Sequence, residues 1–292
     1  MDGQPAENEK GNSRSIFAGV YTYNPIDPAA ALSVVAELGD RWLVPQFLEA
    51  RGIARSEMNF WDGVSYKSVI GRASRSAWRK PIEANIHAYQ AIGIAGYLPP
   101  QPGKIAAPML GGLVVERPRW DSPRELEKAS FVEFDLDPRN LLGQDTVTAE
   151  IQRLFIGHAI ELFERFGGAY AYITKDFVIG AFSSMDSPYE RFYKLRVPRL
   201  WRLREYARGY FWGNALSDLL VERIGGAERL TGLGFTVVRQ IRGGWYVQIT
   251  DDINNIERGA LHRLRDVFSP ILPPPNPDRS AVWTAAMPPY VL

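Results

Sequence analysis

The order of apolar and polar positions predicts short strands that alternate with amphipathic helices. An apolar and aromatic run over residues 16–23 is typical of a strand, and the turn at Pro25 ends it. Residues 28–39 then carry apolar side chains at helical spacing, with Pro28 in the first turn and Gly39 as the stop. The chain therefore opens with a strand followed by a helix.

The next segments are less regular. Residues 66–70 predict a short strand, and residues 81–92 predict a helix with Pro81 in its first turn. The segment 97–112 contains several prolines and glycines, so its composition makes it the best internal linker. We place a soft boundary between two halves of the chain there.

The strongest helical periodicity lies in residues 146–166. Asp145 is a good N-cap for this helix, and the Gly-Gly pair that follows is a good stop. Strand patterns precede and follow it at residues 129–136 and 169–173, with further strand material at 177–181. The apolar residues on one helix face are Val147, Ile151, Leu154, Phe155, Leu162 and Phe166.

Residues 209–268 combine glycines and two periodicities into one unit. An aromatic segment leads into a short helix that ends at Gly225, then a β-hairpin that turns at Gly243, and a final amphipathic helix. Trp245 falls on the core side of the hairpin, so its replacement should destabilise the fold by ~3 kcal/mol or more.

These elements predict an α+β fold with mixed or antiparallel sheets and packed helices, built as two similar-sized halves tightly joined. The predicted regions are a disordered tail (1–14), an N-terminal α+β half (15–110), a C-terminal α+β half (111–272) and a proline-rich tail (273–292).

Composition narrows the classes of protein to consider. The 292 residues are 46% hydrophobic and 12% aromatic, which is typical of a packed globular protein. The chain has no cysteine, so disulfides and thiolate chemistry are excluded. The N-terminus lacks the apolar core of a signal peptide, and no run of roughly 18 apolar residues could span a membrane. We therefore expect a cytoplasmic protein without membrane contact.

Few side chains suggest catalysis or metal binding. His158 falls in the middle of an apolar helix face, where a hydrogen-bonded core histidine is the commoner role. The acidic run at 250–257 lies where a strand passes into a helix, so we interpret its residues as caps rather than cation ligands. We expect no metal and no cofactor. An enzyme is a third hypothesis, with a site assembled from Glu133, Asp135, Asp176 and Asp186.

Residues 191–212, the basic-aromatic segment, interleave arginines with aromatic side chains. This mixture suits phosphate contacts with base stacking, and it equally suits a protein interface, where Trp, Tyr and Arg dominate the binding energy. A solvated basic face over packed aromatics is the third interpretation. The net charge of +1 argues against nucleic acid. The basic residues are Arg191, Lys194, Arg196, Arg199, Arg202, Arg204 and Arg208.

A series of motifs runs through the second half of the chain. The motifs SFVEFDL, the long helix and GGAYAYI come first, followed by YFWGNAL, a helix ending in IGG, AERL, GGW and YVQIT. This order resembles the type VI immunity family and the related immunity protein 52 group of bacterial polymorphic toxin systems. The resemblance covers about residues 110–270.

The resemblance implies a non-enzymatic protein that binds the domain of a cognate toxin and blocks it. Several members are associated with nuclease toxins, which implies that the two proteins meet in the cytoplasm. A nucleic-acid-binding protein that uses residues 191–212 is the alternative hypothesis. We place the toxin-binding surface on Arg196, Arg199, Trp201, Arg202 and Arg204.

Overall fold

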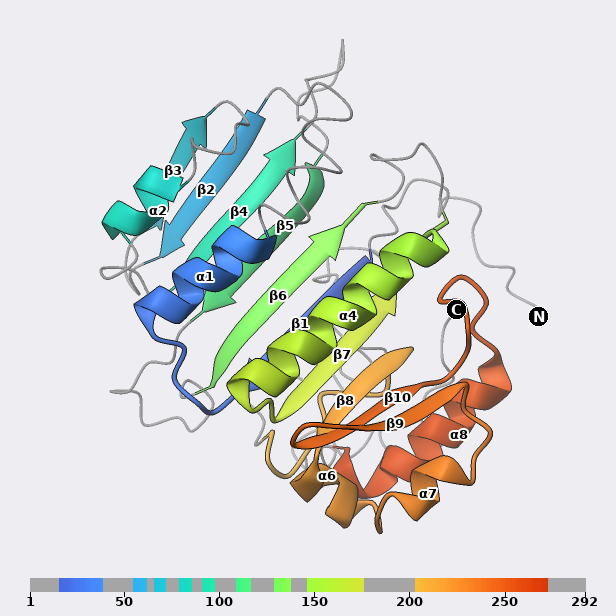
Figure 1. The fold of residues 1–292 in the computed structure, drawn as a ribbon. Helices are drawn as coiled ribbons and strands as arrows, with labels where there is room; N and C mark the ends of the chain where they lie inside the picture. The colour runs from blue at the N-terminus through green and yellow to red at the C-terminus, as the bar shows by residue number, and fades with distance from the viewer. Residues whose placement is uncertain are drawn as a thin grey trace, which may run out of the picture.

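The computed structural model describes residues 16–38, 55–61, 66–71, 79–85, 91–97, 109–116, 129–137, 146–175 and 203–272. Within these residues, ten strands form one sheet in the order β3-β2-β4-β5-β6-β1-β7-β8-β10-β9 (Figure 1), and all paired neighbours are antiparallel. The α+β class is as predicted. The strands are β1 (Ile16–Thr22), β2 (Arg55–Trp61), β3 (Tyr66–Gly71), β4 (Ala91–Tyr97), β5 (Met109–Glu116), β6 (Ser130–Leu136), β7 (Tyr170–Lys175), β8 (Gly213–Ser217), β9 (Val237–Ile241) and β10 (Gly244–Gln248).

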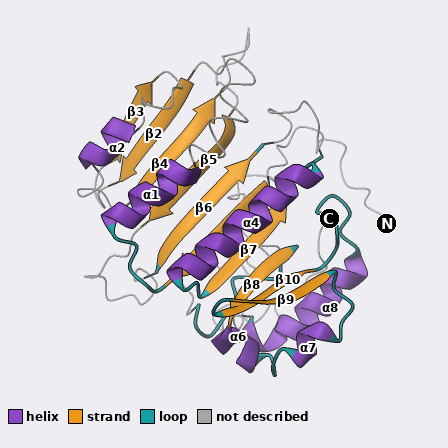
Figure 2. Cartoon of the chain, in the orientation of Figure 1, coloured by secondary structure: helices purple, strands orange, loops and turns teal. Residues whose placement is uncertain are grey.

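The helices form two groups around the sheet (Figure 2). Two of them, α1 and α4, lie on one face, where Arg165 of α4 donates hydrogen bonds to Glu37 and Ser33 of α1 at 3.1 and 3.0 Å. Three others, α6, α7 and α8, gather near β8, β10 and β9. The helices are α1 (Pro28–Leu38), α2 (Arg79–Asn85), α4 (Ala149–Phe166), α6 (Asp218–Arg223), α7 (Glu228–Thr231) and α8 (Arg258–Phe268), followed by the 3-10 turn η5 (Ser269–Ile271).

Strand β1 lies between β6 and β7, near the middle of the sheet, although it comes from the start of the chain. Its residue Gly19 is directly opposite Glu133 of β6 and Tyr172 of β7. The predicted boundary at residue 110 falls inside β5, which pairs with β4 and β6. One continuous sheet therefore runs through both predicted halves.

Strand β5 includes the last four residues of the linker that composition suggested for residues 97–112. Gly111 and Gly112 belong to this strand and pair with small residues of β4, while residues 98–108 lie outside the described residues. Strands β2 and β4 were not predicted, and the helix expected over 81–92 ends at Asn85. The consecutive residues 92–96 of β4 are all buried, so the strand lacks the polar alternation that reveals a half-exposed strand.

The long helix α4 begins three residues later than the periodicity suggested. Thr148 is its N-cap, and the Thr148 hydroxyl oxygen accepts a hydrogen bond from the backbone N–H of Ile151 at 3.4 Å. Gly167 ends the helix with a φ of 59°, which confirms the predicted stop. The expected cap, Asp145, lies outside the described residues.

Several other sequence predictions fall on residues that the structure does not describe. They are the tails at 1–14 and 273–292, the strand at 177–181 and most of the basic-aromatic segment. Among the described residues, none of the helices combines the length and the apolar character needed to cross a bilayer.

Trp212, and not Trp245, is the more deeply buried tryptophan of this region. Trp212 is fully buried, and its indole N–H donates to the backbone oxygen and the hydroxyl oxygen of Thr250 at 3.0 and 3.1 Å. Trp245 is only partly buried, packed at the margin of the core. Trp245 does pack against the core, as the hairpin pattern predicted, but it is less buried than a core aromatic residue.

Candidate functional site

The described part of the basic-aromatic segment starts at Leu203, so it includes Arg204 and Arg208. Arg204 is exposed, and its guanidinium carbon lies 4.7 Å from the centre of the Tyr23 ring, just beyond β1. The Tyr23 hydroxyl also accepts a hydrogen bond from the backbone N–H of Leu203 at 2.9 Å. Tyr23 thus contacts both Leu203 and Arg204. The other predicted toxin-binding residues, Arg196, Arg199, Trp201 and Arg202, lie outside the described residues.

Arg208 has the opposite environment, because its side chain is only 1% exposed. Its guanidinium donates to the hydroxyls of Tyr21 and Tyr172 at 2.7 and 2.8 Å, and lies 3.5 Å from the Glu133 carboxylate. The Tyr21 hydroxyl in turn donates to Glu133 at 2.8 Å. The four residues Tyr21, Glu133, Tyr172 and Arg208 form what we call the Arg208 cluster.

Strand register explains how residues so distant in sequence meet. Directly opposite residues of neighbouring strands project from the same face, so Glu133 and Tyr172 lie on the face of Gly19. Tyr21 is two residues further along β1 and projects from that face as well. A Cβ atom at Gly19 would come within 2.5 Å of the Tyr172 ring, so only glycine lets this ring lie across β1.

Aromatic rings cover the Arg208 cluster. The Arg208 guanidinium carbon lies 4.9 Å from the centre of the Tyr172 ring, and Phe211 stacks on that ring at 4.6 Å. Tyr170 stacks beside Tyr172 and donates a hydrogen bond to the backbone oxygen of Gly209 at 3.2 Å. Residues 208–211 are therefore fixed to the sheet by both polar and aromatic contacts.

Burial keeps the Tyr21 hydroxyl protonated. Burial raises the pKa of Tyr21 well above its usual value, and the Glu133 carboxylate raises it further, against the lowering effect of Arg208. The hydroxyl therefore acts as a donor to Glu133 and as an acceptor from Arg208. Arg208 neutralises a carboxylate inside the protein and is not available to phosphate or to a partner.

The raised pKa of Tyr21 predicts a loss of stability at high pH. The unfolded chain releases this proton near pH 10, whereas the folded protein retains it, so stability is complete below about pH 10 and falls as the pH rises further. Between about pH 10 and 11.5, the free energy of unfolding should fall less steeply with pH in Tyr21→Phe than in the wild type. The two slopes should differ by up to about 1.4 kcal/mol per pH unit. Denaturant titrations measure both slopes, and equal slopes would contradict this role for Tyr21.

The acidic run at 250–257 forms a second polar network, near the start of α4. Asp252 accepts hydrogen bonds from the backbone N–H of Asn254 at 2.9 Å and from the Gln152 amide at 2.7 Å. Asn254 in turn accepts from Lys175 at 2.7 Å. Burial alone would raise the pKa of Asp252, but these hydrogen bonds and the charge of Lys175 lower it.

This network agrees with the interpretation of the acidic run as caps. Asp252 caps a local turn and holds α4, whereas the last helix begins later, at Arg258 after Glu257. Glu257 is the N-cap of that helix, without a side-chain hydrogen bond. The described residues contain no group of three or more His, Asp or Glu side chains placed to hold a metal ion.

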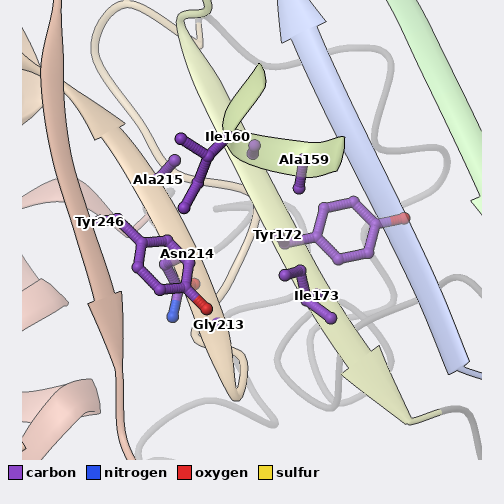
Figure 3. A pocket seen from close by; sticks show the side chains of 9 residues that line it. Ala159, Ile160, Tyr172, Ile173, Gly213, Asn214, Ala215 and Tyr246 are labelled. Atoms are coloured by element: carbon purple, nitrogen blue, oxygen red, sulfur yellow. The ribbon is translucent and has the colours of Figure 1, made fainter. Parts of the chain in front are cut away.

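His158 and the small pocket beside α4 offer little for catalysis. The His158 ring meets the Phe134 ring edge-on at 6.4 Å, and its side chain is 13% exposed. The pocket is lined by α4, β7, β8 and Tyr246 (Figure 3). About 160 Å³ of space lies between its atoms, but none of that space is wide enough for a water molecule, and none of the residues that line it is charged. Such a space suits packing better than the binding of a substrate.

Sequence reasoning missed the Arg208 cluster as a unit. Sequence reasoning named Glu133 only among scattered carboxylates and grouped Arg208 with the other cations of the basic-aromatic segment. Of the other carboxylates that it named, Asp176 and Asp186 lie outside the described residues. The one local signal was Gly19 in the middle of an aromatic strand, which is typical of a close approach by another group. Comparison with known proteins gives no further guide, because no family model, curated protein or solved structure matches the chain.

Proposed function

We propose that this protein is an immunity protein, which binds a cognate toxin of a type VI or polymorphic toxin system and blocks it without catalysis. The observation that carries the proposal is the contrast between Arg204 and Arg208. Arg208 fixes the end of the basic-aromatic segment to the sheet, while Arg204 is exposed and stacked on Tyr23. Rigidly held arginine and aromatic side chains are typical of residues that dominate protein interfaces.

The order of elements between residues 130 and 268 supports the same proposal. Strand β6, helix α4 and strand β7 are followed by β8, α6, α7 and the β9–β10 hairpin. The resemblance predicts this order from the motifs that it shares. Glycines in these motifs have structural roles, since Gly167, Gly225 and Gly243 adopt left-handed or otherwise positive φ values at turns and helix ends.

Preorganisation explains how such a surface would inhibit a toxin. The Arg208 cluster and the contact between Arg204 and Tyr23 hold the described end of the segment before binding, so less conformational entropy of these residues is lost when a complex forms. When the toxin binds to this surface, this protein would cover the active site of the toxin or the path of its substrate. We place this encounter in the cytoplasm, where a nuclease toxin would reach its substrate.

The burial of Arg208 also favours toxin binding over nucleic-acid binding. A phosphate-binding surface requires exposed cations, and Arg208 contributes none because its charge is paired with Glu133 inside the protein. A gel shift that weakened steeply with added salt would favour nucleic acid, because phosphate contacts release counterions.

The predicted toxin-binding residues of the basic-aromatic segment should be required for toxin binding. We expect the double variant Trp201→Ala with Arg202→Ala to bind the toxin at least about tenfold more weakly, because it removes two residue types that dominate interfaces. Its free energy of unfolding should change by less than about 0.5 kcal/mol, as for most surface substitutions. Isothermal titration calorimetry with the toxin domain measures the affinity.

Arg242→Ala is the matched control for this loss of affinity, since the Arg242 side chain is 78% exposed on the β9–β10 turn. It should bind the toxin as the wild type does. An unchanged affinity in the double variant would show that the toxin binds elsewhere on the protein.

A further inference from the structure

Strand β9 ends the sheet, and within the described residues it pairs with β10 alone. Its sequence is VVRQI, in which Arg239 and Gln240 are exposed and both valines are partly buried. An exposed edge strand has unpaired backbone groups that can bind another strand. The side of β9 that faces away from β10 is therefore a candidate binding edge.

Backbone hydrogen bonds on β10 show which residues of β9 direct their N–H and C=O groups outward. The Gly243 carbonyl accepts from Asp218, and the Ile249 N–H donates to the Trp212 carbonyl, so odd-numbered residues of β10 face β8. Even-numbered residues face β9, where Tyr246 pairs with Arg239. Hydrogen bonding alternates along an antiparallel strand, so Val238 and Gln240 direct their backbone groups to the open edge.

The charged side chain of β9 is a cation. Residues 237–244 contain two arginines and no acidic residue. Arg242 pairs with Glu164 of α4 at 3.9 Å, so Arg239 supplies the positive charge of the strand itself. The Arg239 guanidinium carbon lies 5.8 Å from the centre of the Tyr246 ring on β10. Arg239 faces β10 in a hydrogen-bonded pair, so it would face an added strand in a non-hydrogen-bonded pair, where side chains are closer.

We propose that the edge of β9 binds an extended, acidic segment of a partner protein, which adds to the sheet as an antiparallel strand. Val238 and Gln240 supply the backbone hydrogen bonds, and Arg239 selects a carboxylate directly opposite. This mode of recognition takes affinity from the main chain and specificity from alternate side chains.

A second copy of this chain fits the edge poorly. The register that pairs all five residues of one β9 with all five of another centres on Arg239. It would place Arg239 directly opposite its own copy in a close pair, and like charges in that position destabilise a sheet. An acidic partner meets no such repulsion, so charge selects a different chain as the occupant.

This surface is separate from the toxin-binding residues placed on the basic-aromatic segment, and its test requires no toxin. The experiment uses the full chain and two short synthetic peptides labelled with fluorescein. One peptide alternates glutamate with valine and the other alternates lysine with valine. By fluorescence anisotropy, the wild-type protein should bind the glutamate peptide about tenfold more tightly than the lysine peptide. Arg239→Glu should reverse this preference.

A second variant tests whether the main chain of β9 forms the contact. Gln240→Pro removes one outward N–H and keeps the ladder with β10, whereas Gln240→Ala is the control that retains this N–H. We expect the proline variant to lose binding of the glutamate peptide with an unchanged circular dichroism spectrum, and the alanine variant to bind normally.

Three results would overturn the proposal. They are wild-type affinity in Gln240→Pro, an unchanged peptide preference in Arg239→Glu, and a dimer of the wild type that Gln240→Pro abolishes. The last result would show that a second copy occupies the edge. If Gln240→Pro lost its native spectrum, the comparison of Arg239→Glu with the wild type would decide alone.

Discussion

Arg208→Met should lower the free energy of unfolding by about 3–5 kcal/mol, because it leaves one member of a buried ion pair without its partner. Glu133 would lose its cationic partner at a site where its side chain is only 11% exposed. The hydroxyls of Tyr21 and Tyr172 would also lose the donor that now binds both. Urea denaturation followed by far-ultraviolet circular dichroism measures the change.

Arg204→Met is the matched control for Arg208→Met, four residues away. Arg204 is exposed and contacts the Tyr23 ring, so its loss should cost no more than about 1 kcal/mol. In the double variant Arg208→Met with Glu133→Gln, part of the stability should return, because the uncompensated charge is removed. Equal costs for the two arginines would show that the Arg208 cluster contributes little to the fold.

Trp212→Ala should have an effect of similar size, about 3–5 kcal/mol, as expected for a large aromatic side chain replaced in a core. The ring is fully buried, and its N–H bonds to Thr250 connect the start of β8 to the residues after β10. Trp212→Phe keeps most of the apolar contact and should cost less. Denaturant titration of each variant measures the differences.

Trp245→Ala is the internal comparison for Trp212→Ala. Its side chain is only partly buried, so we expect a cost clearly below that of Trp212→Ala. A larger cost at Trp245 would restore the role that the hairpin pattern predicted for it. The two tryptophans thus test whether burial or sequence pattern is the better guide in this hairpin.

Elements that bury one face and expose the other were predictable from the sequence. Helix α4 was predicted from its apolar stripe and from Gly167, which stops it. The β9–β10 hairpin was predicted because Gly243, with a φ of 81°, marks the turn. In each case the residues that determine the structure are close together in the chain.

Elements without a local pattern were not predictable in this way. Strand β4 is buried from residue 92 to residue 96 and has no polar alternation, and the glycines of β5 resemble those of a linker until the neighbouring strand is known. The N-cap of α4 was displaced from Asp145 to Thr148, because Asn254 binds the backbone N–H of Val147 at 3.0 Å and so holds the residues before the helix. Contacts from distant parts of the chain decide these positions.

The candidate site was also only partly predictable from the sequence. A cluster of arginines and aromatic residues was visible in the sequence, but the sequence could not show which arginine is buried. That depends on β1 lying between β6 and β7, since this order brings Tyr21 and Glu133 to Arg208 across separations of 187 and 75 residues. Strand order is a long-range property, and no local pattern specifies it.

The proposed function is neutralisation of a toxin in a stoichiometric complex. Calorimetric titration of the full chain with the toxin domain encoded by the adjacent gene measures this binding. We expect one-to-one binding with a dissociation constant of about nanomolar or below, corresponding to about −12 kcal/mol or stronger. The absence of a complex at micromolar concentrations would contradict it, as would inactivation of the toxin by a much smaller molar amount of this protein.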